Sequence, residues 1–351
     1  MNIKDYGWND FFQKEFDKLN ITNLIPGRIL TDFGQNVRVY TKFDELLVEK
    51  PINRPDLQYA VGDWIAIENI NIVSKPTIKY ILPRKTKFSR AASGIEVKEQ
   101  IVAANIDTVF IMQSLNKDFN LKRLERYLIA SWESGAIPVI ILTKSDCCNN
   151  VSEKILLATD IAPGVEIFAI SNITKNGFSN LLKYFDKGKT IALLGSSGVG
   201  KSTFVNSLLN YNIMKTQEIR EDDSKGRHTT THRELIYLPD GGLIIDTPGM
   251  RTLSLWESES GMDIMFGEIE KLITTCRFYD CTHNSEPGCA IRISLNNGTL
   301  DQKKWASWLK LQKEIKFLEN KKNQKLKQHD KEFGKMQAKH KRNTIKRKTN
   351  Y

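Results

Sequence analysis

Cysteine is scarce in this sequence, and long apolar stretches are missing. Five cysteines in 351 residues are too few for a disulfide scaffold. The longest apolar runs, such as residues 136–142 (AIPVIIL), are far shorter than the roughly 20 residues that span a bilayer. The first ten residues are polar and acidic, unlike a secretory signal. We therefore expect a soluble, cytoplasmic protein that does not enter a membrane.

Positive charge is abundant only at the C-terminal end. From Lys303 onward there are 17 Lys and Arg against 4 Asp and Glu, a local charge of +13. The net charge of the whole chain is +11, so the rest carries about −2. A basic arm on a nearly neutral body favours binding to a polyanion, and nucleic acid more than a membrane.

Composition and length allow several folded domains: 40% of the residues are hydrophobic and 26% are charged. Residues 1–20 have the pattern of a short amphipathic helix. Period-two hydrophobicity between Gly27 and Arg84 then predicts a small β-barrel. Its five predicted strands are residues 28–30, 35–41, 45–49, 61–68 and 77–84. The strand number favours an OB fold, although periodicity does not exclude an SH3-like barrel.

Four basic residues follow the last of these strands: Arg84, Lys85, Lys87 and Arg90. They suit contact with RNA, and they equally suit a solvated linker.

Strands and helices alternate in the next segment, which predicts a doubly wound, mostly parallel α/β sheet. The predicted strands are residues 106–115, 137–143, 165–171, 189–195 and 241–246. The predicted helices are residues 121–135, 151–159, 178–185 and 202–210. Residues 256–318 are expected to be mainly helical. Beyond Lys321 we expect patches of helix or disorder.

A phosphate-binding loop is predicted at residues 195–203, GSSGVGKST. Its glycines allow backbone N–H groups to surround phosphate oxygens at a helix N-terminus. Lys201 is expected to reach the β- and γ-phosphates, and Ser202 to ligate Mg²⁺. The alternative is an ordinary glycine-rich turn, but an apolar strand precedes this loop and a helix follows it. The predicted phosphate-binding residues are Gly195, Ser196, Ser197, Gly198, Val199, Gly200, Lys201, Ser202 and Thr203.

Two further segments suit the Mg²⁺ and γ-phosphate of a bound nucleotide. Asp246 begins the sequence DTPG at a strand end, where its carboxylate suits Mg²⁺ through a water, and Gly249 suits a backbone contact with the γ-phosphate. The threonine that a switch loop needs for Mg²⁺ is assigned to Thr230 in GRHTTTHRE, with Thr229 and Thr231 as neighbours.

The sequence TKSD at residues 143–146 predicts that the bound base is guanine. The Asp146 carboxylate can accept hydrogen bonds from both the ring N–H and the exocyclic amine of guanine, and adenine lacks this donor pair. Lys144 is expected to lie along the base plane. Ser171 follows another predicted strand and could supply a loop under the base. The candidate base-binding residues are Thr143, Lys144, Ser145, Asp146 and Ser171.

The base-reading loop precedes the phosphate loop, the reverse of the usual order in GTPases. Both loops end strands of one parallel sheet, and ligands bind at that carboxyl edge. Joining the original termini and opening the chain elsewhere preserves every contact. The order therefore predicts a circularly permuted GTPase.

Three of the five cysteines cluster with a histidine. Cys276, Cys281, His283 and Cys289 lie within fourteen residues and offer four ligands for a closed, tetrahedral, structural Zn²⁺ site. Buried free thiols beside a histidine are the simpler alternative, and a Cys/His nucleophilic pair would leave the extra thiols unexplained.

From Gly27 to Leu318 this arrangement resembles the small-ribosomal-subunit-dependent GTPases of bacteria. The resemblance implies an OB domain, a permuted GTPase domain and a zinc domain. It also implies GTP hydrolysis stimulated by the small subunit, and a role in late maturation of that subunit. By the family pattern, Thr143, Lys144 and Asp146 bind the base, residues 195–203 bind phosphate and Mg²⁺, and the Cys/His cluster binds zinc.

The chain departs from better-known GTPases at two positions. Met250 follows DTPG, where a water-orienting Gln often stands, so intrinsic turnover should be slow. His228 is the candidate replacement, with His232 as the alternative. Gly198 stands where some related GTPases carry an Asn associated with potassium, so a potassium requirement is not implied. The catalytic candidates are Lys201, His228, Thr230 and Asp246.

The resulting expectation is an enzyme that hydrolyses GTP to GDP and binds the small ribosomal subunit and its rRNA as a monomer. The alternatives are an RNA-binding assembly factor that uses GTP only structurally, and an ATP-driven RNA remodeller, which Asp146 disfavours. The predicted domains are an N-terminal arm (1–20), an OB domain (21–90), the GTPase domain (91–255), a helical zinc domain (256–320) and a basic tail (321–351).

Overall fold

A computed structural model gives the structure of the chain. It describes residues 2–51, 57–68, 76–91, 99–209, 233–238, 241–246, 259–313, 315–316 and 320. The chain separates into two compact units. The first unit consists of Met1–Arg90 and Gln100–Met265, and the second of Ala91–Glu99 and Phe266–Tyr351.

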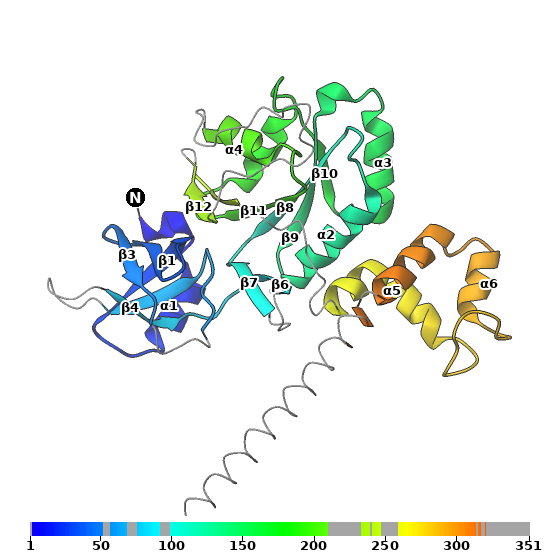
Figure 1. Ribbon diagram of the computed structural model, residues 1–351, viewed down its shortest axis with the longest axis horizontal. Helices are drawn as coiled ribbons and strands as arrows, with labels where there is room; N and C mark the ends of the chain where they lie inside the picture. Colours follow the sequence, from blue (N-terminus) through cyan, green and yellow to red (C-terminus); the bar gives the residue numbers. More distant parts are fainter. Residues whose placement is uncertain are drawn as a thin grey trace, which may run out of the picture. The chain divides into compact units, whose positions relative to one another are not determined.

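Five strands near the N-terminus close into a small barrel (Figure 1). They are β1 (Leu24–Asp32), β2 (Asn36–Thr41), β3 (Glu45–Glu49), β4 (Trp64–Glu68) and β5 (Thr77–Ile81). They pair in the order β1-β2-β3-β5-β4, and β4 pairs again with β1. The β3–β5 pair is parallel, whereas the other pairs are antiparallel. This is the five-stranded arrangement of an OB fold, so the preference for OB over an SH3-like barrel is confirmed.

The N-terminal segment packs on this barrel. It forms a 3₁₀ turn, η1 (Ile3–Tyr6), and the predicted short helix, α1 (Asp10–Asp17). Trp8 and Phe12 are buried, and their rings lie 4.8 and 5.6 Å from the ring of Trp64. Aromatic burial therefore fixes residues 2–17 against the barrel wall.

A six-stranded α/β half follows in the order β10-β9-β8-β11-β13-β12. Its strands are β8 (Thr108–Ser114), β9 (Ile137–Thr143), β10 (Glu166–Ala169), β11 (Thr190–Gly195), β12 (Glu234–Tyr237) and β13 (Leu243–Asp246). All neighbours are parallel except β12, which is antiparallel to β13. The predicted mostly parallel sheet is confirmed. Strand β12 and the two-stranded sheet of β6 (Lys87–Ala91) and β7 (Glu99–Ala104) were not predicted.

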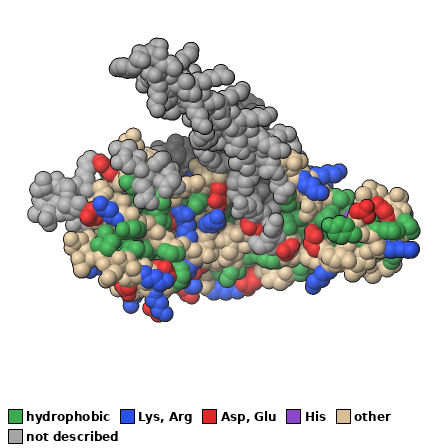
Figure 2. All heavy atoms as spheres, turned by 90° about the horizontal axis from the view of Figure 1, so that it is seen from below, with side chains coloured by type: hydrophobic (Ala, Val, Ile, Leu, Met, Phe, Trp, Pro, Cys, Tyr) green, Lys and Arg blue, Asp and Glu red, His purple; other side chains and the backbone are tan. Residues whose placement is uncertain are grey.

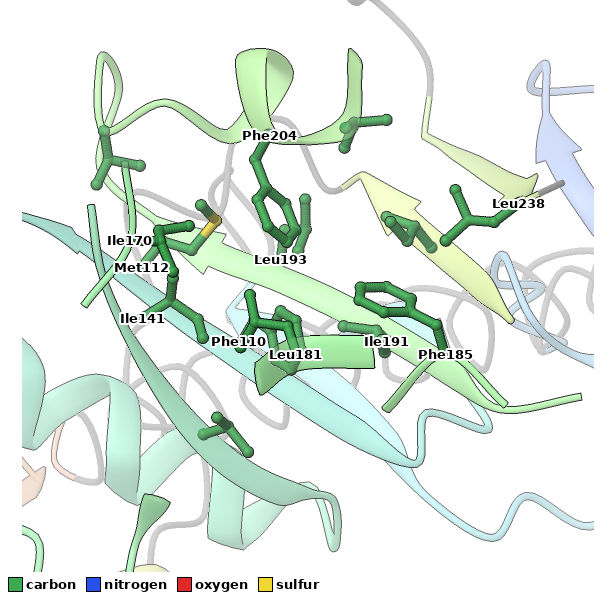
Figure 3. Packing of buried hydrophobic residues seen from close by; sticks show 14 of the residues in the cluster. Phe110, Met112, Ile141, Ile170, Leu181, Phe185, Ile191, Leu193, Phe204 and Leu238 are labelled. Atoms are coloured by element: carbon green, nitrogen blue, oxygen red, sulfur yellow. The ribbon is translucent and has the colours of Figure 1, made fainter. Parts of the chain in front are cut away.

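Helices cover both faces of this half. They are α2 (Leu121–Glu133), α3 (Val151–Ile161) and α4 (Lys201–Leu209), with 3₁₀ segments η2 (Ser145–Cys147) and η3 (Phe178–Tyr184). Residues 178–185 are predicted as an α-helix, but the segment forms η3. Figure 3 shows Phe204 of α4 and Leu181 of η3 packed against Phe110, Ile191 and Leu193 of the strands. Successive residues of a strand point to opposite faces of the sheet. Helix α2 contacts β8 and β9 and covers the face of the sheet opposite to α4 and η3.

The barrel and the α/β half are joined through β1 and a buried arginine. Thr31 of β1 pairs with Glu234 of β12, which makes one continuous sheet. The guanidinium of Arg28, 1% exposed, donates to the carbonyl oxygens of Tyr6, Gly62 (3.3 Å) and Asn105 (3.0 Å). It also donates to the hydroxyl of Thr190 over 2.9 Å. One side chain thus links the N-terminal segment, the barrel and β11.

The second unit contains the C-terminal helices. Helix α5 (Glu259–Thr274) is interrupted at Phe266, whose backbone is not helical, at the boundary between the two units. Helix α6 (Ala290–Asn296) follows the cysteine segment, and residues 302–313 are helical. The prediction of mainly helical structure is confirmed for the described part. Among the described residues, none of the helices is both long enough and apolar enough to cross a bilayer.

Candidate nucleotide and metal sites

The phosphate loop connects β11 to α4, as the sequence predicts. Gly195 ends β11, and a Cβ there would lie 2.5 Å from the carbonyl oxygen of Met112 on β8. Gly200 has a φ of +102° and its Cβ would lie 2.9 Å from Nδ2 of Asn172. Both positions therefore require glycine, one for close strand contact and one for backbone conformation. Ser202 and Thr203 lie in the first turn of α4, where backbone N–H groups favour an anion.

Lys201 folds back over the loop that precedes it. Its Nζ donates to the carbonyl oxygens of Gly195 and Ser196, both over 2.8 Å. The ammonium group is therefore held above the loop between β11 and α4, where it can neutralise phosphate charge.

The TKSD segment lies directly beside this loop. Thr143, fully buried at the end of β9, donates from Oγ1 to the carbonyl oxygen of Val199 over 2.6 Å. Lys144 adopts the left-handed conformation with a φ of +60°, which turns the chain from β9 into η2. The N–H of Ser145 donates to the carbonyl oxygen of Ile170 over 3.1 Å. The predicted base-binding and phosphate-binding segments are thus adjacent in space.

Asp146 is an exposed carboxylate whose neighbours favour its ionised form. A hydrogen bond from the Ser171 hydroxyl, followed by one from the Cys147 thiol, lowers the pKa of Asp146. The Ser171 oxygen accepts from the N–H groups of Ile173 (3.2 Å) and Thr174 (3.1 Å), so its proton is free to point at Asp146. A carboxylate in this state can accept from two donors on one edge of a base.

The strand ends that carry these residues share one edge of the sheet. Gly195, Thr143 and Asp246 each end a strand of the parallel set β9, β11 and β13, and Ser171 lies just after β10. In open α/β sheets this carboxyl edge is where ligands bind. The side chain of Asp246 lies outside the described residues, as do Gly249, Met250, and the segment with His228, Thr229, Thr230, Thr231 and His232.

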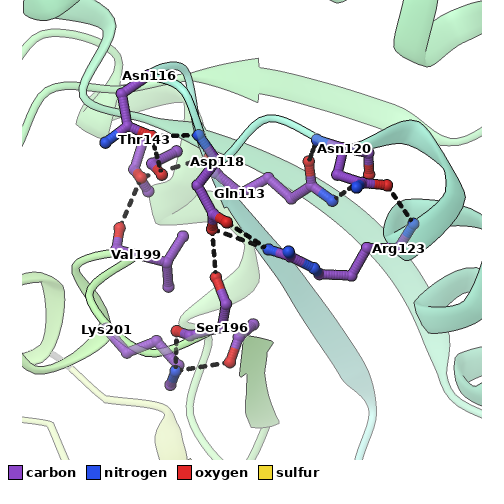
Figure 4. Close-up of polar contacts among 11 residues, drawn as sticks. Gln113, Asn116, Asp118, Asn120, Arg123, Thr143, Ser196, Val199 and Lys201 are labelled. Carbon is purple, nitrogen blue, oxygen red and sulfur yellow. Dashed lines mark hydrogen bonds and ion pairs between the residues drawn. The ribbon is translucent and has the colours of Figure 1, made fainter. Parts of the chain in front are cut away.

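A polar loop between β8 and α2 also reaches the site, and the sequence interpretation missed it (Figure 4). Asp118 accepts two hydrogen bonds from Nη1 of Arg123, at 2.8 and 2.9 Å, and one from the Ser196 hydroxyl at 2.7 Å. The sequence did indicate this loop, because polar residues follow the buried strand β8, which belongs to the parallel set. Another missed residue is Asn172, whose Nδ2 donates to the carbonyl oxygen of Gly200 over 3.2 Å.

The second unit holds a cluster of three cysteines and a histidine. Ligand atoms of Cys276, Cys281, His283 and Cys289 all lie within 4.8 Å of one another. The Nδ1 of His283 is 3.6 Å from Sγ of Cys276 and 3.5 Å from Sγ of Cys289, and these sulfurs are 4.0 Å apart. Zn–S bonds of about 2.3 Å at tetrahedral angles place two sulfurs roughly 3.8 Å apart. The four groups could therefore hold one metal ion.

Local structure and aromatic packing support the cluster. Cys289 occupies the position just before α6 without a side-chain hydrogen bond to the helix, and His283 adopts the left-handed conformation with a φ of +64° in the loop between Cys281 and Cys289. The ring of Trp305 packs edge-on against His283 at 5.7 Å and stacks on Trp308 at 4.9 Å. Such an apolar shell limits the access of solvent to a metal site.

Comparisons with known proteins agree with this arrangement. Residues 81–256 match the family described as RsgA GTPase, and residues 190–345 match the family described as 50S ribosome-binding GTPase. A relative from Listeria innocua, called small ribosomal subunit biogenesis GTPase RsgA 1, is 43% identical over 326 residues, 90% of each chain. One from Vibrio parahaemolyticus, called small ribosomal subunit biogenesis GTPase RsgA 2, is 40% identical over 315 residues, 90% of this chain and 86% of the relative.

Two solved structures share the fold. YjeQ from Thermotoga maritima superposes with a TM-score of 0.61 at 22% identity, covering 83% of this chain and 99% of that one. YloQ, described as a circularly permuted GTPase, superposes with a TM-score of 0.59 at 20% identity, covering 84% of this chain and 95% of that one. The predicted permuted order and the resemblance stated from the sequence are confirmed. The chain belongs to the family of RsgA GTPases.

Proposed function

We propose that this GTPase binds the small ribosomal subunit, hydrolyses GTP on it, and acts in the late maturation of that subunit. The observation that carries the proposal is the hydrogen bond from Thr143 to Val199, which joins the base-reading segment to the phosphate loop. The names of the relatives, small ribosomal subunit biogenesis GTPases, support the choice of partner.

Steady-state GTP turnover tests this proposal in three arms: with small ribosomal subunits, with large subunits, and with neither. Slow turnover alone and strong acceleration by small subunits are expected, since completion of the catalytic site in such enzymes is worth roughly 10³ to 10⁵ in rate. Lys201→Ala should abolish turnover in all arms. Equal rates in the three arms would reject the proposal, and acceleration by the large subunit alone would assign a different partner.

Within the nucleotide site we assign roles by chemistry. Asp146 reads the guanine edge, residues 195–203 surround the phosphates, and Ser202, Thr230 and, through a water, Asp246 serve Mg²⁺. Met250 provides no group that could orient water, and His228 is the proposed replacement. His228→Ala should lower subunit-stimulated turnover and spare GTP affinity, whereas undiminished stimulation would move the role to His232, to backbone groups or to the ribosome.

In the second unit we propose one structural Zn²⁺, held by Cys276, Cys281, His283 and Cys289. Three thiolates and an imidazole are the ligands that zinc prefers, and four protein ligands leave no position for a catalytic water.

We propose that rRNA is bound partly through the basic C-terminal segment. On the face drawn in Figure 2, blue Lys and Arg and red Asp and Glu side chains are interspersed over the described surface. The excess charge of +13 instead belongs to the residues from Lys303 onward. Deletion of residues 321–351 should weaken subunit binding and flatten its dependence on salt, because fewer counterions are released. An unchanged salt slope would show that the segment does not contact RNA.

The remaining organisation is proposed on the same basis. Residues 21–90 form the OB domain, 91–255 the GTPase domain, 256–320 the zinc domain and 321–351 a basic tail. The protein acts as a cytoplasmic monomer. Sedimentation of the free protein as a dimer would contradict the last point.

A further inference from the structure

We propose that Asp118 is a positioning residue for the nucleotide site, and that it holds the phosphate loop through Ser196. The proposal rests on the proposed function, in that residues 195–203 are taken to bind the nucleotide phosphates.

The contact between Asp118 and Ser196 joins segments 78 residues apart in the chain. Ser196 is the second residue of the phosphate loop, and its hydroxyl donates to Oδ2 of Asp118 over 2.7 Å. Its backbone carbonyl oxygen accepts from Nζ of Lys201 over 2.8 Å. Ser196 therefore has its side chain held by Asp118 and its backbone held by the phosphate-binding lysine.

Asp118 is itself held firmly in place. Nη1 of Arg123, in the first turn of α2, donates to both of its oxygens. The backbone N–H of Asp118 donates to Oδ1 of Asn116 over 3.0 Å, and this Asn116 oxygen also accepts from the hydroxyl of Ser114 over 2.8 Å. The carboxylate thus has a fixed direction before any ligand arrives, as a positioning group requires.

The start of the loop 113–120 is hydrogen-bonded to the TKSD segment. Gln113, 1% exposed, exchanges two hydrogen bonds with the backbone of Asn120, at 2.8 and 3.0 Å. The carbonyl oxygen of Gln113 also accepts from Oγ1 of Thr143 over 3.3 Å. The loop 113–120 therefore reaches the phosphate loop at two points, directly through Asp118 and indirectly through Thr143 and Val199 (Figure 4).

The negative charge of Asp118 is compensated by neighbouring cations. An uncompensated carboxylate beside a phosphate site would repel the ligand, but Arg123 pairs with Asp118 by a fork of two hydrogen bonds. Although partial burial raises the pKa of Asp118, hydrogen bonds from Ser196 and Arg123 and the charge of Lys144 lower it overall. The charge of Lys144 also lowers the pKa of Asp146, so this lysine acts on both carboxylates. Asp118 can thus stay an acceptor for Ser196 at neutral pH without opposing phosphate.

The test is binding of a fluorescent GDP analogue to the full-length chain and to four variants: Asp118→Ala, Asp118→Asn, Ser196→Ala and the double alanine variant. Loss of a hydrogen bond to a charged group should weaken binding about tenfold to a hundredfold in each single alanine variant. Asp118→Asn retains an acceptor oxygen and should recover part of the loss. The double variant should bind no worse than Asp118→Ala, because both changes remove the same interaction.

Kinetics separate positioning from folding. The KM for GTP should rise by about the same factor as the Kd for GDP, with kcat nearly kept, because uniform binding is lost. Thermal unfolding of the nucleotide-free Ser196→Ala variant should stay within a few degrees of that of the parent chain, because Asp118 keeps both hydrogen bonds from Arg123. Glu166→Ala is the control, since that exposed carboxylate pairs with Lys183 and Tyr184 away from the site and its loss should leave binding unchanged.

An affinity of Ser196→Ala within about twofold of the parent chain would overturn the positioning role, as a hydrogen bond to a charged group is worth more than that. Additive losses in the double variant would overturn it as well. Ser196→Ala keeps the test decisive even where Asp118→Ala fails to fold. A parent chain that binds no guanine nucleotide would instead overturn the proposed function and this inference together.

Discussion

Thr143 and Val199 lie 56 residues apart, and the hydroxyl of Thr143 donates to the carbonyl oxygen of Val199 over 2.6 Å. Thr143 starts the segment TKSD, and Val199 lies within the phosphate loop. The order of the two segments along the chain is reversed, yet they meet at one edge of the sheet, after β9 and β11, the two strands that flank β8. Permutation of the chain therefore leaves the local geometry of the nucleotide site intact.

Thr143→Val should weaken this junction. Valine has nearly the same shape but lacks the donor, so a buried carbonyl oxygen loses its partner, at a cost of about 1–3 kcal/mol in the free energy of unfolding. GTP affinity should fall with it, as measured by urea unfolding and by nucleotide titration. Thr159→Val is the control, because the exposed Thr159 hydroxyl bonds only within α3 to Ile155. Equal stability of both variants would contradict the assigned role of Thr143.

The ionisation of Asp146 should depend on Ser171. The pKa of Asp146 in the folded chain lies below its ordinary value of about 3.9. The carboxylate is therefore ionised at every pH above about 3.9, and it becomes protonated only when the pH falls through the lowered pKa. Ser171→Ala should raise the pKa towards the ordinary range, as followed by NMR titration of the Asp146 carboxyl carbon. Ser134→Ala, which removes a buried serine hydroxyl at the end of α2, should leave it unchanged. An unaltered titration in Ser171→Ala would disprove the hydrogen bond.

One zinc ion per chain is expected after purification. X-ray absorption should show a tetrahedral site with three sulfur ligands at about 2.3 Å and one nitrogen ligand. Cys281→Ser, or removal of the metal by a chelator, should expose the second unit to proteolysis while nucleotide binding persists, because the nucleotide-site residues lie in the first unit. Cys148→Ser serves as the control, since that partly exposed cysteine lies outside the cluster. Metal-free protein with a protease-resistant second unit would contradict the assignment.

Arg28 should be among the most sensitive positions for stability. Burial lowers the pKa of its guanidinium to about 10, and the charge is compensated by hydrogen bonds to three carbonyl oxygens and the hydroxyl of Thr190. Arg28→Ala removes the Arg28 donor from the buried carbonyl oxygens of Tyr6 and Asn105, whereas the carbonyl oxygen of Gly62 keeps a hydrogen bond from Nδ2 of Asn105. The loss should cost about 3–5 kcal/mol in the free energy of unfolding, because a buried acceptor without a donor costs about 1–3 kcal/mol. Arg28→Lys should rescue little, because an ammonium group lacks the planar fork.

Urea unfolding followed by tryptophan fluorescence measures this effect, since Arg28 lies 5.5 Å from the centre of the Trp64 ring. Lys18→Ala, which breaks an exposed ion pair with Glu15, is the control and should cost less than about 1 kcal/mol. A similar loss in both variants would show that Arg28 does not hold the barrel to the α/β half.

Local patterns in the sequence were sufficient for the elements and the principal motifs. Alternating hydrophobicity predicted the five barrel strands, and a glycine loop between a strand and a helix predicted the position of residues 195–203. Strand β12 was missed because the alternation of strands and helices does not indicate a strand that pairs antiparallel with the next strand, β13, without a helix between them. The 3₁₀ form of η3 was missed because apolar spacing alone does not distinguish 3₁₀ from α-helical hydrogen bonding.

Long-range contacts could not be predicted in the same way. The partners of Arg28 lie 22 to 162 residues away, so a lone arginine in a strand gave no indication of burial. The link between Asp118 and Ser196 likewise depends on which strands become neighbours in the sheet. Periodicity reports which face of an element is buried, but pairing of distant polar groups is decided by the assembled fold.

The nucleotide specificity of Asp146→Asn tests the central claim, that TKSD and the phosphate loop form one guanine-nucleotide site. The carbonyl oxygen at position 2 of xanthine can accept a hydrogen bond from an Asn side chain, whereas guanine presents a donor there. The measurement is competition between GTP and xanthosine triphosphate for the variant and the parent chain. We expect the variant to lose its preference for GTP and to gain one for xanthosine triphosphate. An unchanged preference for GTP would show that the base is read elsewhere and that the two segments do not form one site.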